Sequence, residues 1–193
     1  LGTPKLTIAA GIGCMAAGDI TYVRAGTYVE SFYEGINITF PSGTVGNPIT
    51  IAKYLSEEVT IQPTHDLALG LRVINFNTAD YITLDGLILD AVNMDYDVVQ
   101  IESGSTNIII QNSTLKNADG NNCIGLWGNN GQILNNTIQT CGSSSLHHGI
   151  YTSADDGIIE GNTISGVAGY AVQIHSESRT PVNNIIRRNT YHS

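Results

Sequence analysis

The chain has 193 residues, of which 41% are hydrophobic, so it can bury a core and is not an intrinsically disordered chain. No apolar run reaches the roughly 18–20 residues of a membrane-spanning helix, so no membrane span is expected. The formal net charge of −9 argues against nucleic acid, whose phosphates would be repelled, and is compatible with a neutral glycan, a cationic partner or an anionic polymer bridged by a metal ion.

The first part of the chain contains short strand-like segments without a regular period. Residues 6–17 are expected to form a short helix that covers the open first coil, because an uncovered end exposes strand edges. Strand character follows around Tyr22 to Arg24 and in the segments INITF, PITIAKY, EVTIQP and LRVINF. We therefore interpret residues 1–193 as one domain with an N-terminal cap (1–17), irregular first coils (18–80) and regular coils (81–193).

From residue 81 onward, one segment returns every 23 to 27 residues, as LDGLIL, IQNSTL, ILNNTI, IEGNTI and IRRNTY. A second segment repeats in phase with it, as VVQIE, CIGLW, GIYTS and AVQIH. Each unit holds short apolar strands joined by Gly, Asn, Asp and Ser, without a helical stretch. This pattern predicts an all-β solenoid, a single-stranded parallel β-helix in which each unit winds once and lies about 4.8 Å above the last.

Equivalent residues of successive units should then lie over one another. Inward columns suit β-branched side chains, which hold one rotamer, and we expect them at Val99, Ile124, Ile150 and Val172 and, beside these, at Ile101, Leu126, Thr152 and Ile174. The fourth position of the first segment holds Leu87, Ser113, Asn136, Asn162 and Asn189. We interpret the three asparagines as a structural corner column, because stacked amides can bond to one another and Asn tolerates the left-handed conformation of a tight corner.

Three stretches resemble the opening of secreted bacterial right-handed parallel β-helix proteins: GDITYVRAGTYVE, SGTVGNPITIAKY and YITLDGLILDA. The later HGIYTS, IIEGNTISG and GYAVQIHSES resemble the repeat region of that family. Its members include polysaccharide lyases of the pectate, alginate and chondroitin type, mannuronan epimerases and uncharacterised surface proteins. The resemblance implies a right-handed coil, a polysaccharide or oligosaccharide partner, and a secreted or cell-surface location, although no signal peptide is visible at the start of the sequence.

The second repeated strand carries the candidate substrate-binding residues. Its outward positions form one row of Gln100, Gly125, Tyr151 and Gln173 and a second row of Glu102, Trp127, Ser153 and His175. Aromatic rings with amides beside them suit sugar rings, so we expect substrate contact from Trp127, Gln100, Gln173 and Ser153. The alternative is that these aromatic side chains merely cover the sheet.

Catalysis on this fold, as the resemblance implies, removes a proton next to a uronate carboxylate and needs a base, a group that neutralises the carboxylate and a proton donor. The candidate acid and base groups are His175, Tyr151 and His148. The alternative for His148 is a corner histidine bonded to neighbouring backbone. The sequence lacks the epimerase-type DPH triplet and a clear group of three carboxylates beside an Arg or Lys.

Oxygen-bearing residues are expected to stack just past the same strand, at Asn129, Asp155 and Glu177. Such a cluster could hold calcium, which takes six to eight oxygen ligands, and the alternative is a solvated acidic corner. Cys14, Cys123 and Cys141 lack zinc-site spacing, and their odd number leaves at least one thiol unpaired in a monomer.

Three functional hypotheses remain open. The first is a secreted carbohydrate-active enzyme, a lyase or epimerase acting on an acidic polysaccharide. The second is a non-catalytic glycan-binding or cell-surface module. The third is a structural coil segment of a larger adhesin or tail-spike-like protein, whose C-terminal end would contact further coils or another chain.

Overall fold

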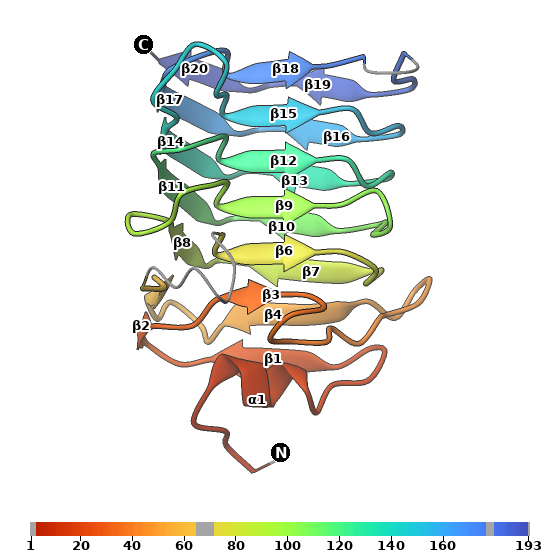
Figure 1. Cartoon of the computed structure of the whole chain (residues 1–193). Coiled ribbons are helices and arrows are strands. Elements are labelled where there is room, and N and C mark those ends of the chain that lie inside the picture. Colours follow the sequence, from red (N-terminus) through yellow and green to blue (C-terminus); the bar gives the residue numbers. More distant parts are fainter. Residues whose placement is uncertain (1–2, 65–71, 177–179, 193) are drawn as a thin grey trace.

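The computed structural model describes residues 3–64, 72–176 and 180–192, and these form a parallel β-helix (Figure 1). The chain winds repeatedly through three parallel sheets, each built from one strand per coil. Sheet A contains β1 (Ile20–Val23), β4 (Ile49–Lys53), β7 (Ile82–Asp85), β10 (Ile109–Gln111), β13 (Gln132–Leu134), β16 (Ile158–Glu160) and β19 (Ile185–Arg187).

The two other sheets are built in the same way. Sheet B contains β2 (Gly26–Tyr28), β5 (Val59–Ile61), β8 (Ile88–Asp90), β11 (Thr114–Ala118), β14 (Thr137–Cys141), β17 (Thr163–Val167) and β20 (Thr190–His192). Sheet C contains β3 (Phe32–Tyr33), β6 (Ile74–Phe76), β9 (Val99–Ile101), β12 (Ile124–Leu126), β15 (Ile150–Thr152) and β18 (Val172–Ile174).

A short helix, α1 (Ile8–Ile12), lies beneath the first coil (Figure 1). The Thr7 hydroxyl caps it by accepting the Ala10 N–H, and the Glu30 carboxylate accepts the N–H groups of Ile8 and of the residue after it at 2.9 and 3.0 Å. Ile8 and Ile12 are buried. The helix is shorter than the expected span of residues 6–17, because Gly11 and Gly13 weaken helix formation and the helix ends at Gly13.

The pairing register is the one that the repeats predict. Val99 pairs with Ile124, Ile124 with Ile150, and Ile150 with Val172. The neighbouring inward column continues from Ile101 through Leu126 and Thr152 to Ile174 in the same register. These side chains are buried from the third to the fifth strand of sheet C, so the columns form the core of the coil.

Corner amides join successive coils between sheets A and B. The Asn162 Oδ1 accepts the Asn136 N–H at 2.9 Å, and the Asn189 Oδ1 accepts the Asn162 N–H at 2.9 Å. Each side-chain NH₂ in turn donates to a backbone carbonyl of the preceding coil, as Asn162 does to Ile133 at 2.8 Å. One residue therefore satisfies both a donor and an acceptor of the backbone at a corner where the sheet ladder is interrupted.

The left-handed corner position is not the one expected. The stacked asparagines are absent from the residues with positive φ, whereas the residue just before each is present: Asn135 (55°), Gly161 (71°) and Arg188 (56°). The fourth position must hold its side chain inside the corner to reach the backbone, so the turn itself falls on the third position. Gly86 and Asn112 occupy the same place in the earlier coils, with φ of 72° and 52°.

Replacing Asn162 by Ala tests the corner column. The change removes the acceptor of the Asn136 N–H and the donor to the Ile133 carbonyl, and leaving these buried groups unpaired should cost about 2–4 kcal/mol of unfolding free energy. Thr163→Ala, at the exposed neighbouring position, should change it by less than about 0.5 kcal/mol. Urea unfolding of both variants measures the difference, and equal midpoints would contradict the structural role.

Candidate binding face on sheet C

The outer face of sheet C collects the sequence-predicted site residues. Its central outward column runs in register from Asn75 through Gln100, Gly125 and Tyr151 to Gln173. The residues that follow each strand form the next column, because Trp127, Ser153 and His175 each donate their backbone N–H to the preceding coil. The structure therefore brings Gln100, Trp127, Tyr151, Ser153, Gln173 and His175 onto one face.

Five rings from neighbouring coils touch one another on this face, and we call them the aromatic stack: Trp127, His148, Tyr151, Tyr170 and His175. The Tyr151 ring is central, with centroid distances of 5.8 Å to Trp127, 5.6 Å to His148 and 5.3 Å to His175. His148 also stacks on Tyr170 at 5.6 Å. Tyr170 is the most exposed member, whereas the others are half-buried or, for His148, buried.

The Trp127 indole folds back over Gly125. A Cβ atom on Gly125 would meet the indole Cη2 at 2.6 Å and the Gln100 Oε1 at 2.7 Å, so the ring occupies the space that a side chain would fill. Gly125 is the one residue of the central column that has no side chain. This glycine is the feature of the sequence from which the position of the indole could have been predicted.

His148 is held in one tautomer. Its Nδ1 accepts the Tyr170 backbone N–H at 2.9 Å, so the proton of the neutral ring must sit on Nε2, on the side of the Gln173 side chain. Burial and the neighbouring His147 lower the pKa of His148 below its usual 6.5, and the hydrogen bond to Gln173 opposes them. This corner role matches the alternative given for His148 from the sequence, and the engaged nitrogens make it a poor general base.

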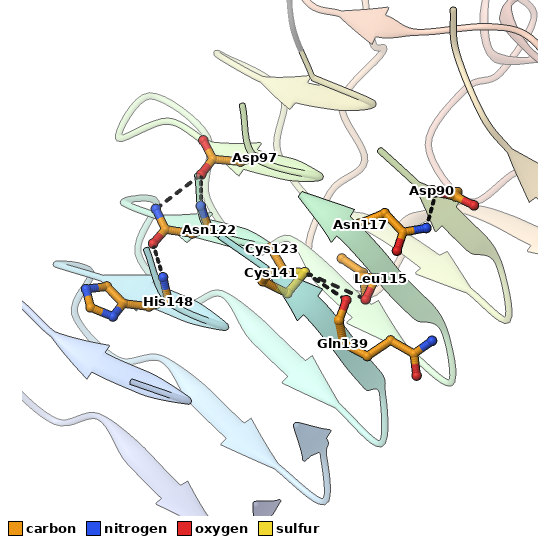
Figure 2. Close-up of a disulfide and its surroundings, with 9 residues drawn as sticks. All are labelled: Asp90, Asp97, Leu115, Asn117, Asn122, Cys123, Gln139, Cys141 and His148. Atoms are coloured by element: carbon orange, nitrogen blue, oxygen red, sulfur yellow. Dashed lines mark hydrogen bonds between the residues drawn. A yellow bond between two sulfur atoms is a disulfide. The ribbon is translucent and has the colours of Figure 1, made fainter. Parts of the chain in front are cut away.

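A buried polar line leads to His148 from the earlier coils (Figure 2). The His148 backbone N–H donates to the Asn122 Oδ1 at 2.8 Å, and the Asn122 side chain donates to the Asp97 Oδ1 at 3.2 Å. Arg72 pairs with the other Asp97 oxygen at 3.1 Å, yet burial raises the pKa of the Asp97 carboxyl despite Arg72 and Asn122. These hydrogen bonds fix the position of the turn that carries His148, whose ring stacks on Tyr151.

A disulfide joins Cys123, at the start of the strand that carries Gly125, to Cys141 at the end of β14, with the Cα atoms 5.4 Å apart (Figure 2). Cys14 is an exposed free thiol. The bond ties the start of β12 in sheet C to the end of β14 in sheet B. From the sequence, at least one of the three thiols had to be unpaired in a monomer, but whether two of them pair, and which two, could not be predicted.

The expected calcium corner is only partly described. Asn129 and Asp155 are stacked as predicted, but the Asn129 Oδ1 accepts the Asp155 N–H and the Asp155 Oδ1 accepts the Val182 N–H, both at 2.9 Å. Glu177 lies outside the described residues. Within the described ranges, no three His, Cys, Asp or Glu side chains are grouped as metal ligands would be. The Asn129 and Asp155 oxygens thus accept hydrogen bonds from the backbone of the corner, and the calcium site stays a prediction.

Comparison with known proteins agrees with this architecture. A family model described as "Right handed beta helix region" matches residues 72–193. The chain belongs to this right-handed β-helix family. No curated protein matches the sequence significantly.

Solved structures show the same fold at low sequence identity. An alginate lyase from Paenibacillus sp. str. FPU-7 superposes with a TM-score of 0.77 at 20% identity, over 95% of this chain and 62% of that chain. A pectate lyase gives a TM-score of 0.66 at 15% identity, over 83% and 43%. A pectin methylesterase in complex with a hexasaccharide gives 0.61 at 11% identity, over 86% and 52%. The chain thus spans less than two thirds of the length of each of these proteins.

None of the helices in the described ranges is long and apolar enough to cross a membrane.

Acidification should loosen the corner that holds the aromatic stack. Because the pKa of His148 is lower folded than unfolded, the stability it contributes is complete above about pH 6.5 and is lost as the pH falls through that value toward the folded pKa. The melting temperature should therefore drop between about pH 7.5 and pH 5. His148→Asn, which keeps an acceptor for the Tyr170 N–H, should reduce this drop in melting temperature. The control His147→Gln should retain most of the drop. An equal drop in wild type and His148→Asn would contradict the assignment.

Proposed function

We propose that the chain binds a polysaccharide along the outer face of sheet C, with the aromatic stack as the surface on which sugar rings rest. The observation that carries this proposal is the contact of Trp127, Tyr151 and His175 across three successive coils, beside the amide of Gln173. Aromatic rings that combine an apolar face with polar edges, together with a few oriented amides, are typical of small-molecule and sugar sites.

Two further observations support the proposal. Three structural neighbours are, by their names, a pectate lyase, an alginate lyase and a pectin methylesterase bound to a hexasaccharide, although their likeness to this chain extends to the fold alone. The Cys123–Cys141 disulfide suits an oxidising compartment, which supports a secreted or cell-surface location. A structural coil segment, the third hypothesis, would need neither an aromatic face nor oriented amides.

Binding is tested by affinity electrophoresis in gels that contain neutral or acidic polysaccharides. Tyr151→Ala removes the central ring and should weaken binding about tenfold or more, equivalent to about 1.4 kcal/mol. Tyr22→Ala removes an exposed tyrosine on the outer face of sheet A, where it contacts Tyr54, and should leave binding unchanged. Equal loss in both variants, or no retardation of the wild type by any polysaccharide, would contradict the proposal.

A second candidate function is β-elimination or epimerisation of a uronate polymer. It is favoured by the contact between the Tyr151 phenol ring and the His175 imidazole ring, which places two candidate proton-transfer groups side by side. In this scheme one of the two takes the proton beside the carboxylate and the other serves the leaving oxygen, while His148 positions Tyr151. Calcium at the corner of Asn129, Asp155 and Glu177 stays part of this candidate, as a cation that would neutralise carboxylate charge.

Catalysis is tested by incubating the protein with pectate, alginate and chondroitin, with and without calcium, and following the absorbance of unsaturated uronate products. Activity should then fall at least about a hundredfold in His175→Ala, in line with the loss of a general acid or base. Asn129→Ala should reduce only the part that depends on calcium. Absence of product, with polysaccharide binding retained, would leave the protein as a non-catalytic binding module.

A further inference from the structure

Two buried acceptors on the outer face of sheet C are unpaired. Gln100 and Asn75 point outward from successive coils, yet they are only 5% and 2% exposed. In the part of the chain that the structure describes, the Gln100 Oε1 and the Asn75 Oδ1 accept no hydrogen bond. A buried acceptor without a donor is destabilising, and such groups in native proteins usually have a functional reason or a missing partner.

The Trp127 indole and the Gln100 Oε1 both border the space over Gly125. The indole lies over Gly125, the next residue of the same column, with the Gln100 Oε1 at its edge and the Tyr151 ring 5.8 Å from it on the other side. The floor of this space is bare backbone because residue 125 has no side chain. Rotation of the indole about its side-chain bonds would leave a slot over Gly125 between the Gln100 amide and the Tyr151 ring.

We propose that this slot over Gly125 is a binding subsite for an uncharged pyranose unit, and that the Trp127 indole occupies it until the sugar displaces the ring. A sugar ring in the slot rests against Tyr151 and donates a hydroxyl hydrogen to the Gln100 Oε1. Asn75 offers a second acceptor about one coil spacing, 4.8 Å, away, which is within reach of another substituent of the same sugar chain. The inference rests on the proposed polysaccharide-binding function and assigns its sugar class.

The charges around the slot favour a neutral sugar over a uronate. The strands of sheet C and the residue after each strand contain no Lys or Arg. Arg72, the cation near this end of the face, is paired with Asp97. Glu102 stands next to Trp127 in its column, and Glu34 is held by the N–H groups of residues 77–79. A uronate carboxylate in the slot would meet acceptors and carboxylates without a compensating charge, which is costly at a buried site.

We expect the closed form and the sugar-bound form to have similar free energies, so that the exchange of indole for sugar is reversible. The closed form buries part of the indole but leaves the Gln100 Oε1 without a donor, whereas the bound form exposes the indole and satisfies that oxygen. A ligand shifts such an equilibrium only through the interactions that differ between the two forms. The hydroxyl bond to Gln100 and the contact of the sugar ring with Tyr151 are the interactions present in the bound form alone.

Trp127 is the single tryptophan of the chain, so its fluorescence reports directly on the slot. We would titrate the protein with neutral oligosaccharides of glucose, xylose and mannose, and with oligogalacturonate and oligoalginate. A neutral oligosaccharide should bind and shift the emission to longer wavelength as the indole enters water. A shift to shorter wavelength would mean that sugar stacks on a stationary indole, which would overturn the proposal.

Two variants separate the slot from the rest of the face. Gln100→Leu removes the acceptor at similar volume and should bind at least about tenfold more weakly. Its melting temperature should not fall, because the Gln100 Oε1 accepts no hydrogen bond from the described residues. Tyr22→Ala, on the outer face of sheet A, should bind like the wild type. If neutral or acidic glycans bind but Gln100→Leu binds like the wild type, or only uronates bind, the slot proposal fails while the binding function stands. If no glycan binds, both fail.

Discussion

The register between successive coils is the constraint on which every feature of this protein depends. Inward columns of apolar side chains hold each coil over the next, and the corner amides of Asn136, Asn162 and Asn189 bond one coil to its neighbour. A slip of one residue in a strand would turn its inward side chains outward. The amides oppose such a slip because their bonds to backbone groups exist in one register only.

The same register creates the binding face. Residues about two dozen positions apart become vertical neighbours, so Trp127, Tyr151 and His175 meet although no two of them belong to the same coil. The disulfide and the polar line from Asp97 to His148 then hold the strand and the corner from which this face is built. Among the described residues, Gln100 and Asn75 are, together with Ser105, the buried side chains with an oxygen that accepts or makes no hydrogen bond, and Gln100 and Asn75 lie on the outer face of sheet C. Such unpaired groups in native proteins usually have a functional reason or a missing partner.

The repeats were sufficient to predict the fold, the inward columns and the rows on the outer face, because each of these follows from period and alternation alone. The repeat period does not determine where a side chain points beyond its Cβ atom. The fold of the Trp127 indole over Gly125, the tautomer of His148 and the pairing of Cys123 with Cys141 depend on such directions. The left-handed corner residue was misplaced by one position for a related reason, since Asn suits both the turn and the amide contact.

Nuclear magnetic resonance of the labelled aromatic rings tests the central claim most directly, because it reports on the stacking of the coils and on the ligand in one sample. The account predicts cross-relaxation between the Tyr151 ring and the rings of Trp127 and His175, and shifts confined to these rings and the Gln100 amide when an oligosaccharide is added. Cross-relaxation that is missing between these rings, or ligand-induced shifts centred on sheet A or sheet B, would contradict it.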